Sequence, residues 1–195
     1  MHAYALMSTF PGSRLLVAEN LSVRQWTSVL KLAAFWQMDD LAGIVVEKLS
    51  QSNSNREDWM ALLDMSIQHD ILESRALAIR KLWALIANGE GTEMVLLARR
   101  YQVPDWLERG LQALVQREEF FSDEDERQLG WRTIFRLCCL REQWQDHNRH
   151  RRPSIGWNWN LDEEIRQEFF DEFKIIGGEG KENEGVFELE TAIAG

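Results

Sequence analysis

The sequence is poor in cysteine, and it has no long apolar run. Its only two cysteines, Cys138 and Cys139, are adjacent in a chain of 195 residues. A disulfide framework is therefore excluded, and a reducing compartment is expected. A membrane-spanning helix needs roughly 18 or more consecutive apolar residues, and no such run is present. The first residues lack the basic start and the cleavage site of a signal peptide. We therefore expect a soluble intracellular protein, located in the cytoplasm, the nucleus or both.

The chain also has too little positive charge for a general nucleic-acid-binding protein. Its 22 basic and 32 acidic side chains give a formal net charge of −10. Nucleic-acid binding needs a basic face, because affinity comes largely from neutralised phosphates. The acidity is concentrated after Asp162, where acidic side chains greatly outnumber basic ones. The residues before Asp162 are therefore nearly neutral, and binding of nucleic acid is not expected.

Catalytic signatures are missing as well. None of the four histidines lies in a recognisable motif, and no glycine-rich phosphate loop is present. A zinc site would have to combine the two cysteines with His147 and His150. Their spacing fits no common zinc pattern, and adjacent residues of a helix point about 100° apart. We therefore predict that the chain is not an enzyme and that it binds neither a metal nor a cofactor.

The most clearly patterned stretch is residues 94–119, which predicts two short helices joined by a tight turn. Apolar residues recur at helical spacing in each half. Pro104 favours the first turn of a helix and disfavours helix in the residue before it, so it sets the turn. Thr92 is expected to cap the first helix. Gly110, which costs about 1 kcal/mol against alanine in a helix, predicts close approach of a neighbouring helix.

Two earlier stretches repeat this hairpin pattern. Residues 25–49 match residues 58–82 at an offset near 33 residues, with tryptophan over tryptophan at positions 26 and 59. Residues 94–119 form a looser third copy, expected 34 or 35 residues further on. In the first copy, Ser22 and Gln25 predict a capping box, and Asp39 or Asp40 is expected to cap the second helix. A constant offset of this length predicts three helical hairpins that stack on one another.

The remaining helices are expected to cover this stack. Ser122 caps a predicted helix that runs to about Gln143 and covers the open end of the hairpins. A last amphipathic helix is predicted from Asp162 to about Lys174, followed by a disordered acidic tail from Gly177. Most tryptophans lie on apolar helical stripes and are expected to be mainly core: Trp26, Trp36, Trp59, Trp83, Trp106 and Trp131.

A short basic and tryptophan-containing segment joins the last two helices. Arg149, Arg151 and Arg152 could contact phosphate or direct nuclear import, but a solvated linker paired with the acidic tail is favoured. Trp157 and Trp159 either dock on the helical body, which is the commoner outcome, or anchor a partner, because exposed tryptophans are enriched in binding hot spots. These five residues are the predicted partner-binding residues.

Three blocks of the sequence carry a resemblance to a known family. LSVRQWTSVLKLAAFW, EMVLLARRYQVPDWLERGLQALVQREE and LGWRTIFRLCCLRE resemble, in order and spacing, the region after the BTB/POZ domain in fungal BTB-domain proteins. The resemblance covers roughly Leu21 to Glu142. It implies a BACK-like helical segment that positions partners, within proteins that often act as adaptors, some of them for cullin-type ubiquitin ligases. Nearly the whole BTB fold is absent here, so cullin binding is not expected.

Together these patterns predict an all-α protein of about three stacked hairpins, a capping helix, a C-terminal helix and an acidic tail. The predicted segments are an N-terminal remnant of a preceding domain (1–20), a helical domain (21–145), a basic linker (146–160), an amphipathic helix (161–176) and a tail (177–195). The expected function is a non-enzymatic, adaptor-like protein–protein interaction module. The alternatives are a nucleic-acid-associated or nuclear regulatory protein that uses residues 149–152, and a truncated product without independent function. The sequence names no partner and leaves the oligomeric state open.

Overall fold

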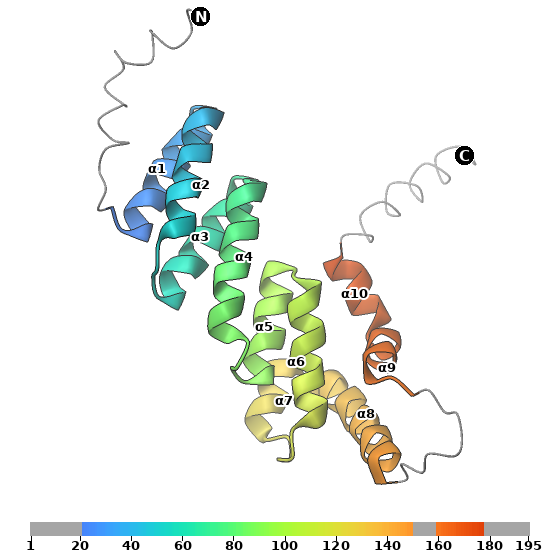
Figure 1. The fold of residues 1–195 in the computed structure, drawn as a ribbon. Coiled ribbons are helices and arrows are strands. Elements are labelled where there is room, and N and C mark those ends of the chain that lie inside the picture. Colours follow the sequence, from blue (N-terminus) through green and yellow to red (C-terminus); the bar gives the residue numbers. More distant parts are fainter. Residues whose placement is uncertain (1–20, 150–158, 178–195) are drawn as a thin grey trace, which may run out of the picture. The chain divides into compact units, whose positions relative to one another are not determined.

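A computed structural model describes residues 21–149 and 159–177, and every regular element within them is an α-helix (Figure 1). The predicted all-α class is confirmed. The chain divides into two compact units after Ala87. The first unit contains α1 (Val23–Phe35), α2 (Asp39–Gln51), α3 (Arg56–Gln68) and α4 (Leu72–Ile86). The second contains α5 (Gly91–Tyr101), α6 (Pro104–Gln116), α7 (Asp123–Leu129), α8 (Trp131–Arg149), α9 (Leu161–Glu168) and α10 (Phe170–Ile176).

The first unit consists of two hairpins that stack on each other. Helix α1 packs on α2, α3 packs on α4, and the two hairpins meet through α1 against α3 and α2 against α4 (Figure 1). Ser22 and Gln25 form the predicted capping box at the start of α1, and Asn55 caps α3. The core of this unit is made by residues that recur in both hairpins and are at most 4% exposed: Trp26, Leu30, Val45 and Leu49, then Trp59, Leu63, Ala78 and Leu82.

All three hairpins turn in the same way. The residues Gln37, Asp70 and Gln102 have φ angles of 54°, 53° and 54°, and they are the only non-glycine residues with positive φ in the described ranges. In each turn the next amide N–H donates to a carbonyl five residues back, at N···O distances of 2.8, 2.9 and 3.1 Å. This is the Schellman arrangement, in which a left-handed residue ends a helix. The duplication is therefore a repeat of backbone geometry as well as of sequence.

The turns define the register of the repeat and correct the offset of the third hairpin. The first two turn residues are 33 residues apart, as the sequence predicts, but Gln102 follows Asp70 by 32. The predicted offset of 34 or 35 fits only the starts of the first helices, Arg56 and Gly91. The difference of three residues arises because α5 has 11 residues where α3 has 13, and because Gln102 directly follows α5 whereas His69 lies between α3 and Asp70. The third hairpin is thus in register with the others at its turn.

Two predicted caps are wrong. Helix α5 begins one residue before Thr92, whose buried hydroxyl instead donates to the carboxylate of Asp125 at 2.8 Å. Helix α2 begins after Met38 and has no side-chain cap, so Asp39 and Asp40 lie inside its first turn. Carboxylates in the first turn still face the positive end of the helix dipole. In the turn before α2, the Met38 N–H donates to the carbonyl oxygen of Ala33 and so satisfies an acceptor at the end of α1.

Helices α5 and α6 lie unusually close together, as Gly110 predicts. A Cβ atom on Gly110 would lie 2.8 Å from Cγ2 and 2.9 Å from the backbone nitrogen of Val95. A Cβ atom on Gly91 would lie 2.9 Å from both the carbonyl oxygen of Gly110 and Cγ of Leu114. Counted from the turns, Gly91 occupies the place of Trp26 and Trp59. The helices of the third hairpin can therefore approach closely because a glycine stands where the first two hairpins have a tryptophan.

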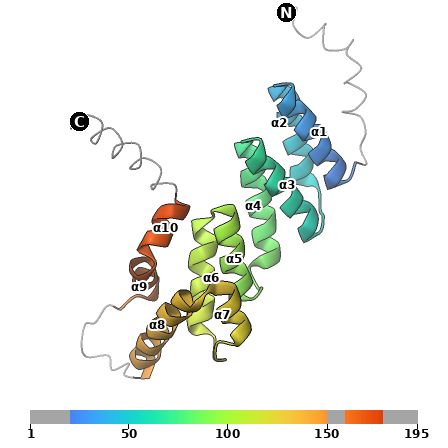
Figure 2. The ribbon, with the colours of Figure 1, turned by 180° about the vertical axis from the view of Figure 1, so that it is seen from behind.

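The helices after α6 are divided differently from the prediction. The predicted helix from Ser122 to about Gln143 is two helices, because Gly130 has a φ of 84° and ends α7. Helix α8 then continues six residues beyond the predicted end, to Arg149. The predicted C-terminal helix is also two, α9 and α10, which are divided at Phe169. Figure 2 shows α7 and α8 lying against α5 and α6, where they cover this hairpin as predicted for a capping helix.

An ion-paired network holds α7 and α8 to the hairpin. The carboxylate of Asp125 accepts from Arg117 Nη2 at 2.8 Å and from the backbone and side chain of Ser122. These bonds, chiefly that of Arg117, hold the pKa of the Asp125 carboxyl well below its usual range. Arg141 of α8 donates to the carbonyl oxygens of Leu114 and Glu119 at 2.8 and 2.9 Å, which satisfies acceptors at the end of α6.

A second cluster anchors α10. The guanidinium of Arg99 on α5 pairs with both carboxylate oxygens of Glu172, at 2.6 and 3.2 Å. The same group donates to Thr133 Oγ1 at 3.0 Å and to the carbonyl of Leu129 at 3.3 Å. A two-pronged arginine–carboxylate pair fixes geometry as well as charge. The predicted segment 1–20, and the predicted tail apart from Gly177, lie outside the described residues.

Candidate functional site

Large apolar side chains are exposed together at one end of the first hairpin. Leu32 is 51% exposed, Phe35 76%, Trp36 62% and Met38 45%. All four lie at the end of α1 or in the turn to α2. The prediction that Trp36 is mainly core is therefore wrong, and the same holds for Trp131, which is 62% exposed. Exposed apolar residues in one contiguous patch mark interaction surfaces more often than scattered ones do.

The repeat shows what would normally cover this patch. Val29, Leu32 and Trp36 form one stripe of α1, because they are spaced three and four residues apart. Counted from the turns, their equivalents on α3 are Leu62, Met65 and His69. Leu62 and Met65 are 0% and 7% exposed, and α3 packs against α1. In the described part of the chain, the stripe that is buried on α3 is thus largely exposed on α1.

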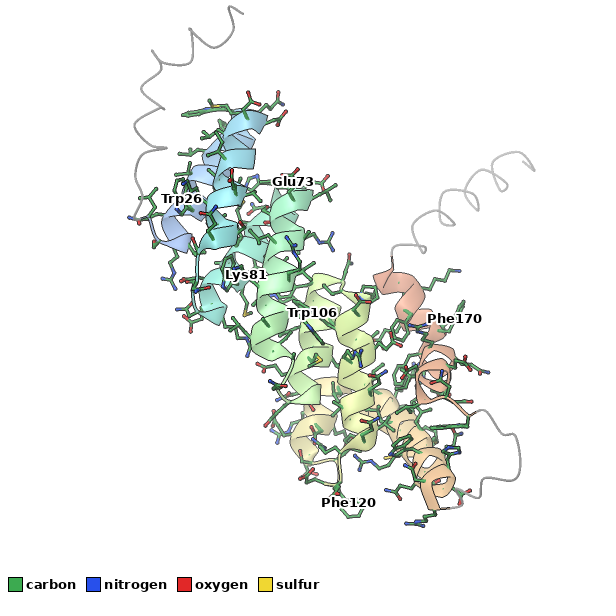
Figure 3. The ribbon with its side chains drawn as sticks, viewed as in Figure 1. Trp26, Glu73, Lys81, Trp106, Phe120 and Phe170 are labelled. Carbon is green, nitrogen blue, oxygen red and sulfur yellow. The ribbon has the colours of Figure 1, made fainter. Side chains whose placement is uncertain are left out.

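Helix α2 presents a matching stripe. Leu41, Ile44 and Lys48 are half-buried, whereas their equivalents Ser74 and Leu77 on α4 are 0% and 3% exposed. The third equivalent, Lys81, has its ammonium 5.5 Å from the centre of the Trp59 ring, and it donates to the carbonyl oxygen of Ser52 at 3.2 Å. Figure 3 shows Lys81 on α4 beside the first hairpin. We call the six residues Val29, Leu32, Trp36, Leu41, Ile44 and Lys48 the end face.

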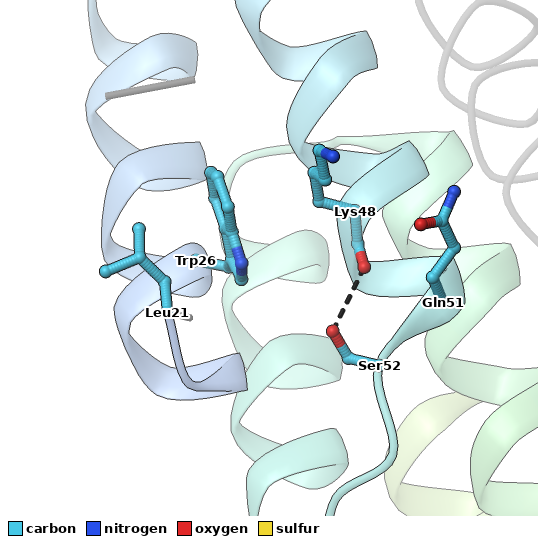
Figure 4. Close-up of a pocket in the computed structure, with 5 residues that line it drawn as sticks. All are labelled: Leu21, Trp26, Lys48, Gln51 and Ser52. Atoms are coloured by element: carbon cyan, nitrogen blue, oxygen red, sulfur yellow. Dashed lines mark hydrogen bonds between the residues drawn. The ribbon is translucent and has the colours of Figure 1, made fainter. Parts of the chain in front are cut away.

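A pocket opens at the Lys48 end of the end face. It has a volume of about 350 Å³ and is lined by Leu21, Trp26, Lys48, Gln51 and Ser52. Figure 4 shows Leu21 and Trp26 on the α1 side of the pocket, and Lys48, Gln51 and Ser52 on the α2 side. Trp26 and Lys48 are the equivalents of the Trp59–Lys81 pair. Among the described residues no hydrogen bond or ion pair of the Lys48 ammonium is found, so this ammonium can bind an added group.

The opposite end of the end face is acidic. Asp39 and Asp40 follow the turn directly and are both exposed. The end face therefore has exposed apolar side chains in its middle, carboxylates beside Trp36 at one end and an ammonium in a pocket at the other. The arrangement thus combines exposed apolar side chains with charges of both signs.

The two predicted partner-binding residues that the structure describes, Trp159 and Arg149, lie elsewhere. Trp159 is half-buried against α8, where its ring lies 5.9 Å from that of Trp144 and stacks on His147 at 5.2 Å. Arg149 is exposed at the end of α8. Trp157, Arg151 and Arg152 lie outside the described residues. The part that Trp159 and Arg149 play in binding stays a prediction.

The second unit has its own exposed apolar side chains, but they are more dispersed. Trp131 and Phe135 share one face of α8 and are 62% and 64% exposed. Phe120 in the loop after α6 and Phe170 on α10 are 92% and 62% exposed. Figure 3 shows both side chains at the outside of the unit. No equivalent helix in this unit shows a covered copy of these residues, so their exposure carries less information than that of the end face.

The end face was not singled out from the sequence, although a signal was present. The tryptophans at positions 26 and 59 share one register, but Trp36 falls in the register of His69. Apolar spacing places Trp36 on a helical stripe, but it does not show which helix covers that stripe.

Metal sites and membrane-spanning helices are two further features that a chain of this kind could have. In residues 21–149 and 159–177, no three histidine, cysteine or acidic side chains lie close enough to hold a metal ion together. No helix within these ranges is long and apolar enough to cross a membrane. Compared with known proteins, the chain matches no family model, no curated protein and no solved structure.

Proposed function

We propose that this chain is a non-enzymatic protein–protein interaction module of the adaptor type, and that it binds through the end face. The single observation that carries the proposal is the exposure of Leu32 and Trp36, at 51% and 62%, on a stripe whose copy in the next hairpin is buried by a helix. A surface built to receive a helix, and left uncovered, is a protein-binding surface in its shape and its chemistry.

The proposal includes the relationship that the sequence suggests, to the region after the BTB fold of fungal BTB proteins, and a location in the cytoplasm or nucleus. It is consistent with the absence of a catalytic signature in the sequence. Stacked helical hairpins commonly present extended faces to partners rather than enclosed reaction sites. A partner bound at the end face would contact an apolar stripe that is flanked by Asp40 and Lys48.

The test is affinity purification of the tagged full chain, followed by mass spectrometry, in three matched versions. They are the unchanged chain, Trp36→Ala and Trp131→Ala, which both remove a tryptophan that is 62% exposed. We expect specific proteins to be lost with Trp36→Ala and retained with Trp131→Ala. Equal recovery with both variants would place the binding surface elsewhere, and recovery of no protein at all would contradict the proposed function.

A further inference from the structure

We propose that the end face binds a second copy of this chain, in a two-fold symmetric dimer with antiparallel helices. This inference rests on the proposed function, because it names the partner of the same surface. It starts from the polarity of the end face along the helices. Trp36, Asp39 and Asp40 lie at the turn end, whereas Lys48 and the pocket lie at the other end.

Two copies of such a face complement each other only in one of the two symmetric orientations. A two-fold axis parallel to the helices would place turn end on turn end, so that Asp39 and Asp40 of both copies gather at the same end of the interface. Like charges opposed in an interface are unfavourable. An axis across the helices reverses the second copy and brings its Lys48 opposite Asp40 of the first. Symmetry then forms this ion pair twice.

The same reversal places a large exposed side chain opposite a cavity. Trp36 is 62% exposed, and ten residues before it on α1 lies Trp26, which lines the pocket of about 350 Å³. In the antiparallel orientation, Trp36 of each copy faces the pocket of the other. An indole there would lie beside the ammonium of Lys48, as the Trp59 ring lies 5.5 Å from that of Lys81. A cation over a tryptophan face is favourable, and tryptophan is the commonest interface anchor together with tyrosine and arginine.

The middle of the interface is then apolar. Ile44 lies four residues from both Asp40 and Lys48, so an Asp40–Lys48 pairing between copies centres α2 on Ile44. Val29 and Leu32 lie on either side of the corresponding middle of α1, so Val29 of one copy lies near Leu32 of the other. The result is an apolar centre rimmed by ion pairs, which is the usual anatomy of a protein interface.

The first experiment is sedimentation of the purified full chain over a wide range of protein concentration. We expect a monomer–dimer equilibrium for the unchanged protein and a dissociation constant at least about 30-fold weaker for Trp36→Ala, the loss expected for a tryptophan hot spot. Trp131→Ala is the matched control and should leave the constant unchanged. A monomer at every concentration, or a dimer that is indifferent to Trp36→Ala, would overturn the proposal.

A second experiment tests the orientation through charge reversal. Lys48→Glu and Asp40→Lys should each weaken the dimer, and the double variant should restore it, because only the antiparallel arrangement pairs these two positions. Failure of the double variant to recover would reject this dimer. A variant without residues 1–20 tests whether that segment occupies the end face instead. If the full chain is a monomer and the shortened chain is a dimer, residues 1–20 cover the end face in the full chain and the inference is wrong. A monomer that still loses a captured protein with Trp36→Ala would remove the second copy as partner and leave the proposed function standing.

Discussion

The hairpin α3–α4 and the hairpin α5–α6 share one turn geometry but reach a packed state by opposite means. The turn residues have φ angles of 53° and 54°. Eleven residues before the turn, α3 has Trp59, which is 2% exposed, whereas α5 has Gly91. Eight residues after the turn, α4 has Ala78 and α6 has Gly110. One hairpin fills the space between its helices with an indole, and the other removes the space by bringing the backbones together.

The turn therefore fixes the register of the two helices, while the residues where the helices are in contact fix the distance between them. Both hairpins bury the same position counted from the turn. Leu82 and Leu114, each twelve residues after its turn residue, are 1% and 0% exposed. Packing density inside proteins leaves few voids, so each solution tolerates only its own side chains. Exchange of residues between the two hairpins should therefore be costly in both directions.

The largest effect is expected from removing the indole of the α3–α4 hairpin. Trp59→Ala should lower the free energy of unfolding of the first unit by about 3–5 kcal/mol, the usual cost of a tryptophan truncated in a core. Urea titration followed by far-ultraviolet circular dichroism measures it. Trp131→Ala, at 62% exposure, is the control with little expected effect. A loss below that of the control would mean that α4 can close on α3 as α6 closes on α5.

The reverse change should damage the α5–α6 hairpin. Gly110→Ala adds a methyl group 2.9 Å from a backbone nitrogen of α5 that cannot rotate away. We expect a loss of about 2–3 kcal/mol in the second unit, typical of overpacking and larger than the gain in helix propensity. The matched control is Gly43→Ala in α2, where an added Cβ meets nothing within 4 Å. This control should instead gain up to about 1 kcal/mol. Equal effects of the two substitutions would refute close approach at Gly110.

In the second unit, the partly buried ion pair of Arg117 with Asp125 makes stability depend on pH. Asp125→Asn should cost about 2–3 kcal/mol, because hydrogen bonds to a charged partner are lost while Arg117 stays. The pKa of Asp125 is lowered on folding, so its contribution is complete above the unfolded pKa, about 3.9, and is lost as the pH falls below that value.

Thermal melts of the unchanged chain and of Asp125→Asn, from neutral to acid pH, would measure this contribution of Asp125 to stability. The difference in melting temperature between the two proteins should narrow as the pH falls below about 4. Asp58, whose pKa is lowered by Ser54 and Arg24, is the corresponding group of the first unit, but its partner Arg24 is 67% exposed. Asp58→Asn should therefore show a smaller effect of the same sign. A constant difference at all pH values would contradict the role of Asp125.

The smallest effect concerns the feature that the hairpins share. A non-glycine residue in the left-handed region carries strain of the order of 1 kcal/mol, which glycine relieves at a smaller entropic cost. Gln37→Gly, Asp70→Gly and Gln102→Gly should each raise the free energy of unfolding by up to about 1 kcal/mol. Similar gains at all three sites, measured in urea, would show that the turns are energetically equivalent. A loss at one site would show that its side chain has a role beyond the turn.

The sequence predicted those features that depend on neighbours along the chain or on its duplication. The all-α class, the Ser22 capping box, the turn before Pro104 and the close approach at Gly110 are confirmed. Each follows from local sterics or from a repeated apolar pattern. The break at Gly130 was missed because one glycine inside an amphipathic pattern is ambiguous between a tolerated residue and a helix end.

The candidate site was beyond such reasoning, because exposure depends on which helix lies next to a stripe. Trp36 and Trp59 are indistinguishable as apolar residues on a helix, yet they are 62% and 2% exposed. Likewise, Thr92 looks like a cap from its position, and only the fold brings Asp125 within 2.8 Å of it. Long-range placement of this kind needs the assembled structure.

The common turn has a consequence for how the chain can change in length. Cutting the backbone at Gln37 and rejoining it at Asp70 would join two points with the same left-handed geometry, 33 residues apart. Such a splice removes one hairpin length, α2 and α3, so that α1 is followed by α4 and the phase of every later residue is preserved. Insertion of 33 residues between the same points also preserves the phase, whereas gain or loss of a single residue inside a helix would rotate the rest of that helix's stripe by about 100°. One hairpin length is therefore a change in chain length that keeps both the turns and the stripes within the helices intact.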